Sequence, residues 1–144
     1  MHKYFIFFLL FISKFSFSQI EISWQDLEDV EFSEVYVDEV DEYILFPNFG
    51  LGVRELDAQE VVLSGYILAL DPDKGYYVLS KGPFASCFFC GAGGPETIVE
   101  LSLKSDKDSF YMDEFTTIKG TLKLNIDDIY RCVYILENAE VNKR

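Results

Sequence analysis

The chain has 144 residues, of which 25 are Asp or Glu and 12 are Lys or Arg, so its formal net charge at pH 7 is −13. A polyanion of this size is repelled by phosphate backbones, which argues against nucleic acid as a partner and leaves cations or a basic protein face. The only histidine is His2, so the rest of the chain lacks the usual general base and every Ser-His-Asp arrangement.

Residues 1–18 have the pattern of a secretory signal peptide. A basic start is followed by an apolar run from Tyr4 to Ile12 and by small residues at Ser16 and Ser18. The run is shorter than the roughly 20 residues that cross a bilayer, so we expect no transmembrane segment in the mature chain; an uncleaved N-terminal anchor is the alternative. We expect cleavage before Gln19 and export to the periplasm or the exterior. Cleavage removes two lysines and no acid, so the net charge falls from −13 to −15.

Residues 19–58 form an acidic arm that precedes the regular part of the sequence. Apolar and acidic residues alternate there with a mixed period, which predicts a short turn or helix near Trp24 to Asp29 and then an extended segment. Pro47 and two glycines predict a loop over residues 46–52. We expect this arm to lie against the following domain as an N-terminal extension.

Residues 59–144 carry five segments with strand character, separated by turn residues such as those of Asp71-Pro72-Asp73-Lys74-Gly75. Glycines stand inside the first and fourth segments, at Gly65 and Gly120, where a small closed sheet needs sharp bends. The pattern therefore predicts a mainly β domain, a five-stranded OB-like barrel. A two-sheet sandwich is the alternative. The predicted strands are Val61–Leu70, Tyr76–Ser80, Thr97–Leu103, Thr116–Leu124 and Tyr130–Leu136.

The loop between the second and third predicted strands contains Cys87 and Cys90 in C-x-x-C spacing. Two such thiols can contact one soft metal ion such as zinc, close a Cys87–Cys90 disulfide, or exchange disulfides with a partner. A closed zinc site needs four ligands; the chain offers Cys132 and carboxylates such as Glu96 besides these two, so such a site would have to recruit ligands from far apart. The glycines after Cys90 cannot continue a helix, which disfavours a thioredoxin-like thiol. Metal contact, a local disulfide and buried thiols all remain open at this point.

Aromatic residues surround the two cysteines. Phe84, Phe88 and Phe89 are predicted to pin the loop to the barrel, although an OB-like barrel also binds ligands across the two strands that this loop joins. Cys132, in the last predicted strand, is interpreted as a packed apolar residue.

Several of these features resemble a family of small exported bacterial proteins that carry a domain of unknown function. The resemblance lies in the glycine-containing strand 61–67, in the loop 83–91 with Gly94-Pro95-Glu96, and in Trp24 and Leu27 of the arm. It implies an OB-like fold and a periplasmic or lipid-anchored accessory protein, similar to partners of ABC-type permeases, some of them linked to metal supply. No enzymatic activity is implied. The chain departs from lipid-anchored members in having no cysteine at its cleavage site.

The sequence thus predicts a non-enzymatic exported binding or accessory module. Its Cys87/Cys90 loop would contact a metal ion or a partner protein, such as a membrane permease or another envelope protein. One alternative is a thiol–disulfide redox protein that uses Cys87 and Cys90. Another is a structural adaptor whose acidic face docks a basic partner.

Overall fold

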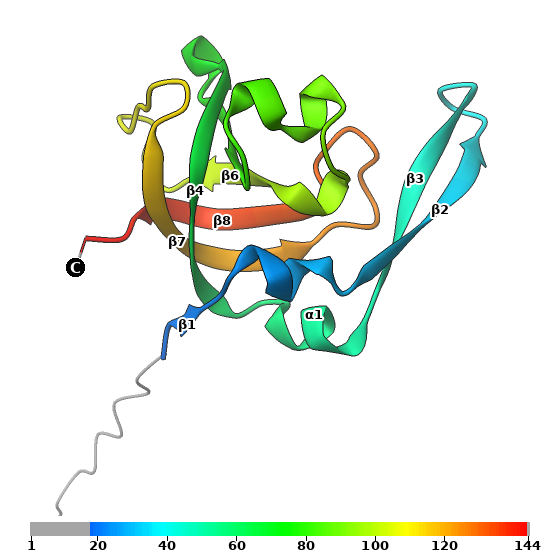
Figure 1. Cartoon of the computed structure of the whole chain (residues 1–144), viewed down its shortest axis with the longest axis horizontal. Helices are drawn as coiled ribbons and strands as arrows, with labels where there is room; N and C mark the ends of the chain where they lie inside the picture. The colour runs from blue at the N-terminus through cyan, green and yellow to red at the C-terminus, as the bar shows by residue number, and fades with distance from the viewer. Residues whose placement is uncertain (1–17, 144) are drawn as a thin grey trace, which may run out of the picture.

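The computed structural model describes residues 18–143, so the predicted signal peptide lies outside the described residues except for Ser18. Figure 1 shows a β-barrel from which a two-stranded ribbon projects on one side. Across residues 18–143, no helix has both the length and the apolar character needed to span a bilayer.

Five strands close the barrel in the order β4-β5-β6-β8-β7, and β7 returns to pair with β4. β6 and β8 run parallel, whereas the other neighbours are antiparallel. This confirms the predicted five-stranded OB-like barrel. A short strand, β1, adds to β4 in parallel. The strands are β1 (Ile20–Glu21), β4 (Glu60–Asp71), β5 (Tyr76–Ser80), β6 (Ile98–Leu103), β7 (Phe115–Leu124) and β8 (Tyr134–Val141).

Gly65 lies where β4 changes partner. The residues up to Tyr66 pair with β7, and those from Tyr66 onward pair with β5. A Cβ atom at Gly65 would lie 2.6 Å from the carbonyl oxygen of Ser80 and 2.9 Å from the Trp24 ring. The strand therefore needs glycine at the point where it passes from one side of the barrel to the other.

The segment before the barrel completes its core. The 3₁₀-helix η1 (Trp24–Glu28) and the helix α1 (Leu51–Leu56) place Leu27 and Val53 in the barrel interior, where both are fully buried. The Tyr134 hydroxyl, itself buried, donates a hydrogen bond of 2.8 Å to the Leu27 carbonyl. Residues of the predicted arm are thus part of the folded core.

A second apolar cluster lies on the outside of the barrel wall. Along β4, β5 and β6 the side chains alternate between the two faces, so Leu68, Val78 and Ile98 point away from the interior. The loop between β5 and β6 covers them with Cys87 and Phe88. This loop holds the short 3₁₀-helices η3 (Phe84–Ser86), η4 (Phe88–Cys90) and η5 (Pro95–Thr97), and η2 (Pro72–Lys74) forms the predicted turn between β4 and β5.

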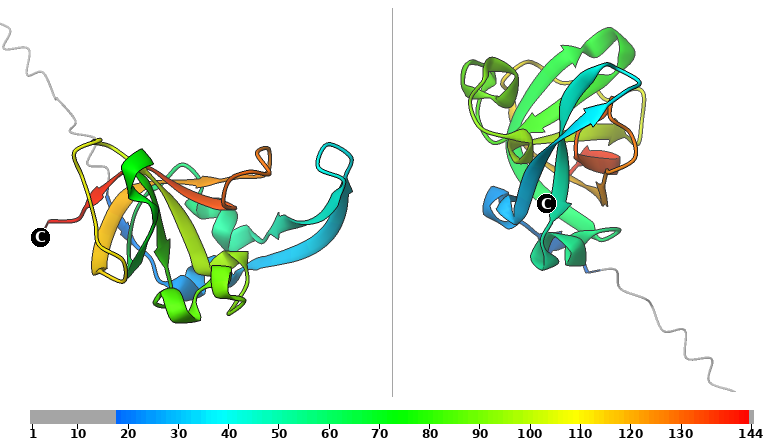
Figure 2. Two further views of the ribbon diagram at one scale, coloured as in Figure 1. Left: turned by 90° about the horizontal axis from the view of Figure 1, so that it is seen from above. Right: turned by 90° about the vertical axis from the view of Figure 1, so that its right-hand side faces the viewer.

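The ribbon consists of β2 (Val30–Val37) and β3 (Glu42–Phe49), which pair only with each other. It replaces the single extended segment and the 46–52 loop that the sequence predicts. The end of β3 leads directly into α1, and there the Asp29 carbonyl accepts the N–H of Gly50 at 2.8 Å and its carboxylate accepts the N–H of Gly52 at 2.9 Å. The left view of Figure 2 shows the ribbon extending away from the barrel, and in the right view the ribbon lies in front of the barrel.

Candidate binding groove

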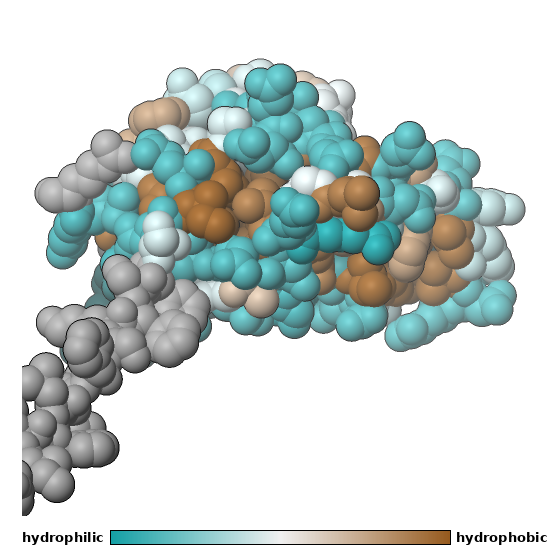
Figure 3. Space-filling view, turned by 90° about the horizontal axis from the view of Figure 1, so that it is seen from below, coloured by the Kyte–Doolittle hydropathy of each residue, from teal (hydrophilic) through white to brown (hydrophobic). Residues whose placement is uncertain are grey.

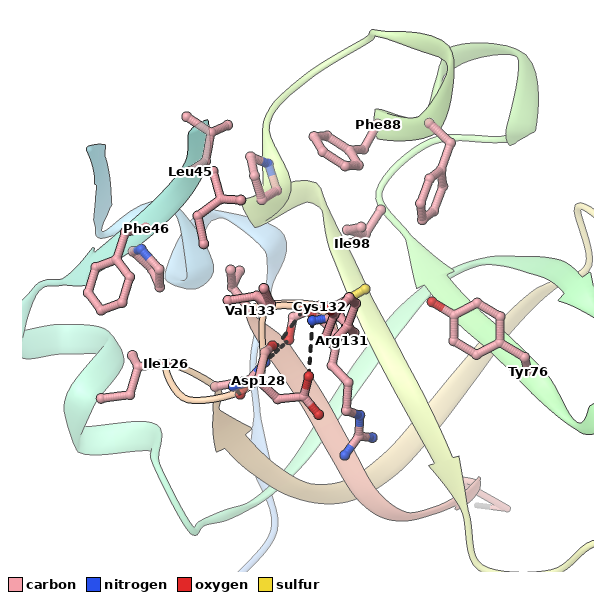
Figure 4. A pocket seen from close by; sticks show the side chains of 17 residues that line it. Leu45, Phe46, Tyr76, Phe88, Ile98, Ile126, Asp128, Arg131, Cys132 and Val133 are labelled. Atoms are coloured by element: carbon pink, nitrogen blue, oxygen red, sulfur yellow. Dashed lines mark hydrogen bonds between the residues drawn. The ribbon is translucent and has the colours of Figure 1, made fainter. Parts of the chain in front are cut away.

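A groove with a volume of about 420 Å³ lies between the ribbon and the barrel. Three segments form most of it: β3, the β5–β6 loop that carries Cys87 and Cys90, and the β7–β8 loop over residues 125–133; Tyr76 of β5 and Ile98 of β6 also line it. In Figure 4, Leu45 and Phe46 lie on one side, Phe88, Ile98 and Tyr76 on the other, and Arg131 and Cys132 between them. The lining is mostly apolar, which is typical of sites that hold apolar ligand groups or side chains.

The wall contributed by the ribbon is the edge of β3. Four consecutive residues, Ile44, Leu45, Phe46 and Pro47, all line the groove. Successive side chains of a strand point to opposite faces, so a strand that presents only one face would contribute alternate residues. The backbone edge of β3 therefore faces the groove.

The β7–β8 loop is held in shape by Asn125, whose side chain is buried in it. The Asn125 amide donates to the carbonyl of Asp128 at 2.8 Å and to that of Cys132 at 3.1 Å, and its oxygen accepts the N–H of Asp128 at 3.1 Å. Because the loop is closed in this way, β8 begins at Tyr134, four residues later than the predicted start at Tyr130. The residues between them line the groove instead.

Arg131 is a cation in the lining, and its charge is already compensated. Its guanidinium donates to one carboxylate oxygen of Glu100 through Nε at 2.8 Å and through Nη2 at 2.6 Å, and to the Ser102 hydroxyl at 3.0 Å. The second carboxylate oxygen of Glu100 accepts the N–H of Cys132 at 3.2 Å. The hydrogen bonds to Glu100 raise the pKa of Arg131 above its ordinary value. Arg131 is thus a structural group rather than a free positive charge.

Cys87 and Cys90 are brought together, as their spacing predicts. Their sulfur atoms are 3.9 Å apart and both thiols are free. Cys87 is buried against the outer cluster, whereas Cys90 is exposed and its thiol donates to the Phe84 carbonyl at 2.9 Å. Desolvation by the loop, and then the contact with Cys87, raises the pKa of Cys90.

A closed zinc site requires four ligands, of which the thiol pair supplies two. Within residues 18–143 no group of three or more His, Cys, Asp or Glu side chains is placed to share one metal ion. Two sulfur atoms alone do not fit a closed zinc site. Cys132 is partly buried against the same outer cluster, beside Tyr76: burial, and then the charge of Glu100, raises the pKa of Cys132 to about 12.

Of the three phenylalanines in the loop, one packs against the barrel and two are exposed to solvent. Phe88 packs on the outer cluster, as predicted, and its ring lies 5.6 Å from that of Phe89. Phe84 and Phe89 are exposed, and Phe89 lines the groove.

Two parts of the groove lining were not predicted from the sequence: Ile44–Pro47 of the ribbon, and Ile126, Ile129 and Tyr130 of the β7–β8 loop. The sequence signal for the β7–β8 loop was the presence of isoleucine and tyrosine beside aspartates, and these apolar side chains are exposed in the structure. Exposed apolar side chains in an otherwise charged stretch indicate a contact surface.

Comparison with known proteins bears on the fold. No known protein family matches the sequence, and no curated protein matches it. The structure is similar to the crystal structure of a DUF3299 family protein from Pseudomonas aeruginosa PAO1, with a TM-score of 0.52 and 16% sequence identity. The match covers 88% of this chain and 98% of the other.

This neighbour belongs to a family of unknown function, in agreement with the expected likeness to a domain of that kind. It lends no support to the expected resemblance to accessory proteins of permeases. At this level of identity the similarity concerns the fold: this chain shares its architecture, over nearly its whole described length, with a protein whose family name assigns no activity.

Proposed function

We propose that this chain is a non-enzymatic exported binding module that holds an apolar segment of a partner protein in the groove between the ribbon and the barrel. The observation that carries the proposal is the convergence of three separate segments of the chain on one mostly apolar groove. Two of them, the ribbon and the β7–β8 loop, project from the barrel and expose apolar side chains to solvent.

The exposure of lining residues supports binding rather than internal packing. Tyr130 is 71% exposed, and Leu45, Phe89 and Ile126 are also exposed. Figure 3 shows apolar surface interrupted by polar side chains at the end of the molecule that carries the ribbon. Apolar side chains gathered at a concave site mark a contact surface for another molecule.

Site-specific photocrosslinking in the producing cells tests this proposal. A photoreactive amino acid is placed at Tyr130, on the groove rim, and in a matched variant at Tyr111, which is 84% exposed. Tyr111 lies in the β6–β7 loop, at the end of the molecule away from the ribbon in Figures 1 and 2. We expect an adduct of discrete mass from position 130 and none from position 111.

The same variant at position 130 is then combined with Ile126→Asp, which places a charge in the groove. Loss of the adduct supports the groove as the binding site. Equal adducts from positions 130 and 111, or no adduct from position 130, would contradict the proposal.

A second candidate function is thiol–disulfide exchange, which the 3.9 Å separation of the Cys87 and Cys90 sulfurs favours. The raised pKa of Cys90 weighs against it, because a reactive thiol of this kind is stabilised as the thiolate. Reduction of a disulfide substrate is compared between the parent and Cys87→Ser. Equal turnover by the two proteins removes this candidate.

A further inference from the structure

The outer edge of β3 is a strand edge without a partner. β3 pairs with β2 on one side, and the two strands form a sheet of their own. In an antiparallel pair every second residue directs its N–H and C=O away from the partner strand. Over Glu42–Phe46 none of these outward groups has a hydrogen-bond partner within the described part of the chain.

The open stretch of this edge has a defined length and position. Pro47 lacks an N–H and so ends the run of donors toward the barrel. At Phe49 the outward carbonyl accepts the Nε–H of Arg54 at 2.8 Å, which closes the edge at its barrel end. The free edge is therefore Glu42–Phe46, and its second half borders the apolar groove.

Charge on the ribbon indicates the chemistry of the molecule that fits there. Residues 30–49 contain six carboxylates and neither Lys nor Arg. None of the six forms an ion pair with another residue between 18 and 143. In the β7–β8 loop, which borders the same groove, Asp127 and Asp128 add negative charge, and Arg131 is compensated by Glu100. A basic segment is thus complementary to both the ribbon and this loop.

The same charges disfavour a second copy of this chain as the occupant. Edge-to-edge pairing of two ribbons would bring two sets of six carboxylates together, and like charges across an interface cost several kcal/mol. Acidic side chains on an exposed edge are a known protection against such self-pairing.

We propose, on the basis of the function proposed above, that the Glu42–Phe46 edge of β3 binds an extended, basic segment of a partner protein by strand addition. Backbone hydrogen bonds to the edge would provide affinity, while alternate side chains of the added strand enter the apolar groove. Lysine or arginine at the intervening positions would meet the carboxylates of the ribbon and of the β7–β8 loop.

Labelled peptides of ten residues test the proposal by fluorescence anisotropy with the purified protein. One peptide alternates Lys with Val or Ile, and a matched peptide carries Glu in place of each Lys. We expect saturable binding of the Lys peptide, weakened by salt, and at least about tenfold weaker binding of the Glu peptide because like charges repel. Equal affinity for both peptides overturns the proposal.

Backbone methylation distinguishes strand addition from charge attraction alone. Two versions of the Lys peptide carry N-methyl groups at alternate positions, one version on the odd residues and the other on the even residues. Only the residues that face β3 need their N–H, so one version is expected to lose at least about tenfold in affinity and the other to retain it. Equal loss or equal retention in the two versions contradicts strand addition.

Two protein variants test whether the peptide binds at the ribbon. Leu45→Ser removes an exposed apolar contact and should weaken binding of the Lys peptide, whereas Tyr111→Ser should not; thermal unfolding confirms that both are folded. Sedimentation that shows a dimer which the Lys peptide cannot dissociate would assign the edge to a second copy instead. If position 130 gives its crosslink and the Lys peptide does not bind, strand addition is wrong and the groove remains a binding site.

Discussion

Gly65 is a residue at which the backbone of a neighbouring strand leaves no room for a side chain. Any Cβ atom there would overlap the Ser80 carbonyl, a backbone atom that cannot move without opening the β4–β5 pairing. We expect Gly65→Ala to lower the free energy of unfolding by about 2–3 kcal/mol, as for other overpacked sites, measured by urea denaturation. Gly75→Ala is the control: its φ of 70° is unfavourable for alanine, but no atom lies within 4 Å, so its cost should stay near 1 kcal/mol. An equal cost for both would contradict the steric argument.

The three cysteines should differ in reactivity within the folded, reduced protein. Cys90 is exposed, Cys87 is buried, and burial raises the pKa of Cys132 to about 12. Because the thiolate is the reactive form and must be reached by the reagent, alkylation at pH 8 should modify Cys90 first. Mass spectrometry of peptides after short exposure to iodoacetamide measures the order, with the urea-unfolded protein as control. Faster modification of Cys132 than of Cys90 would show that the arrangement at the groove is wrong.

Among the structural elements, η1 depends on a carboxylate at its start. The Asp26 carboxylate accepts hydrogen bonds from the Ser23 N–H at 2.7 Å and from the Ser23 hydroxyl at 2.8 Å, which lower the pKa of Asp26. A lowered folded-state pKa contributes stability above the unfolded value of about 3.9, and this stability is lost as the pH falls through the folded value. Asp26→Asn should therefore destabilise at pH 7, and the difference from the parent should close below about pH 4.

Urea denaturation between pH 2 and pH 7 follows that difference for Asp26→Asn. The control is Asp73→Asn in η2, which changes the net charge by the same amount at an exposed turn. A difference for Asp26→Asn that is unchanged at pH 2 would show that the carboxylate charge is not what stabilises η1.

The pair of Glu100 and Arg131 joins β6 to the β7–β8 loop. Glu100 is only 7% exposed, so removing its partner leaves a buried charge. We expect Arg131→Met to lower the free energy of unfolding by about 2 kcal/mol, less than for a fully buried pair because the Arg131 side chain is 32% exposed. The double variant Glu100→Gln/Arg131→Met should recover most of the loss in the same denaturation assay. A double variant as unstable as Arg131→Met would contradict the role of the unpaired carboxylate.

The strands of the barrel could be predicted because each is bounded by local turn chemistry. The turn at Asp71 to Gly75 forms as its residues indicate, with Gly75 in the left-handed region. The ribbon could not be predicted in this way, because the acids of β2 and β3 lie on both faces and leave no alternating pattern. Helix α1 also escaped prediction, since Gly50 and Gly52 favour a loop until Asp29, from a distant part of the chain, binds their N–H groups.

For the candidate site, the contact between the two cysteines could be predicted from the sequence, but the groove could not. The C-x-x-C spacing placed Cys87 and Cys90 together, a contact made within one loop. The groove arises only when β3 and the β7–β8 loop meet that loop, which depends on packing between residues about 40 to 90 positions apart in the sequence.

At the scale of the whole molecule, the barrel serves as a support for an acidic ribbon and a groove that lie at one end. The core that holds them includes residues from both the N-terminal segment and the barrel, so the ribbon is anchored through Leu27, Phe49 and Val53. The net charge of −13 and the local carboxylates of the ribbon have the same sign, so both would attract the basic partner proposed above from a distance.

Amide hydrogen exchange of the protein, with and without the Lys peptide, reports directly on whether a strand adds to β3. Strand addition predicts slower exchange at alternate amides within Glu42–Phe46, and unchanged exchange in the β6–β7 loop around Tyr111. Exchange that stays the same along β3 while the peptide is bound, or protection that appears only elsewhere in the barrel, would show that the peptide does not bind by strand addition to β3.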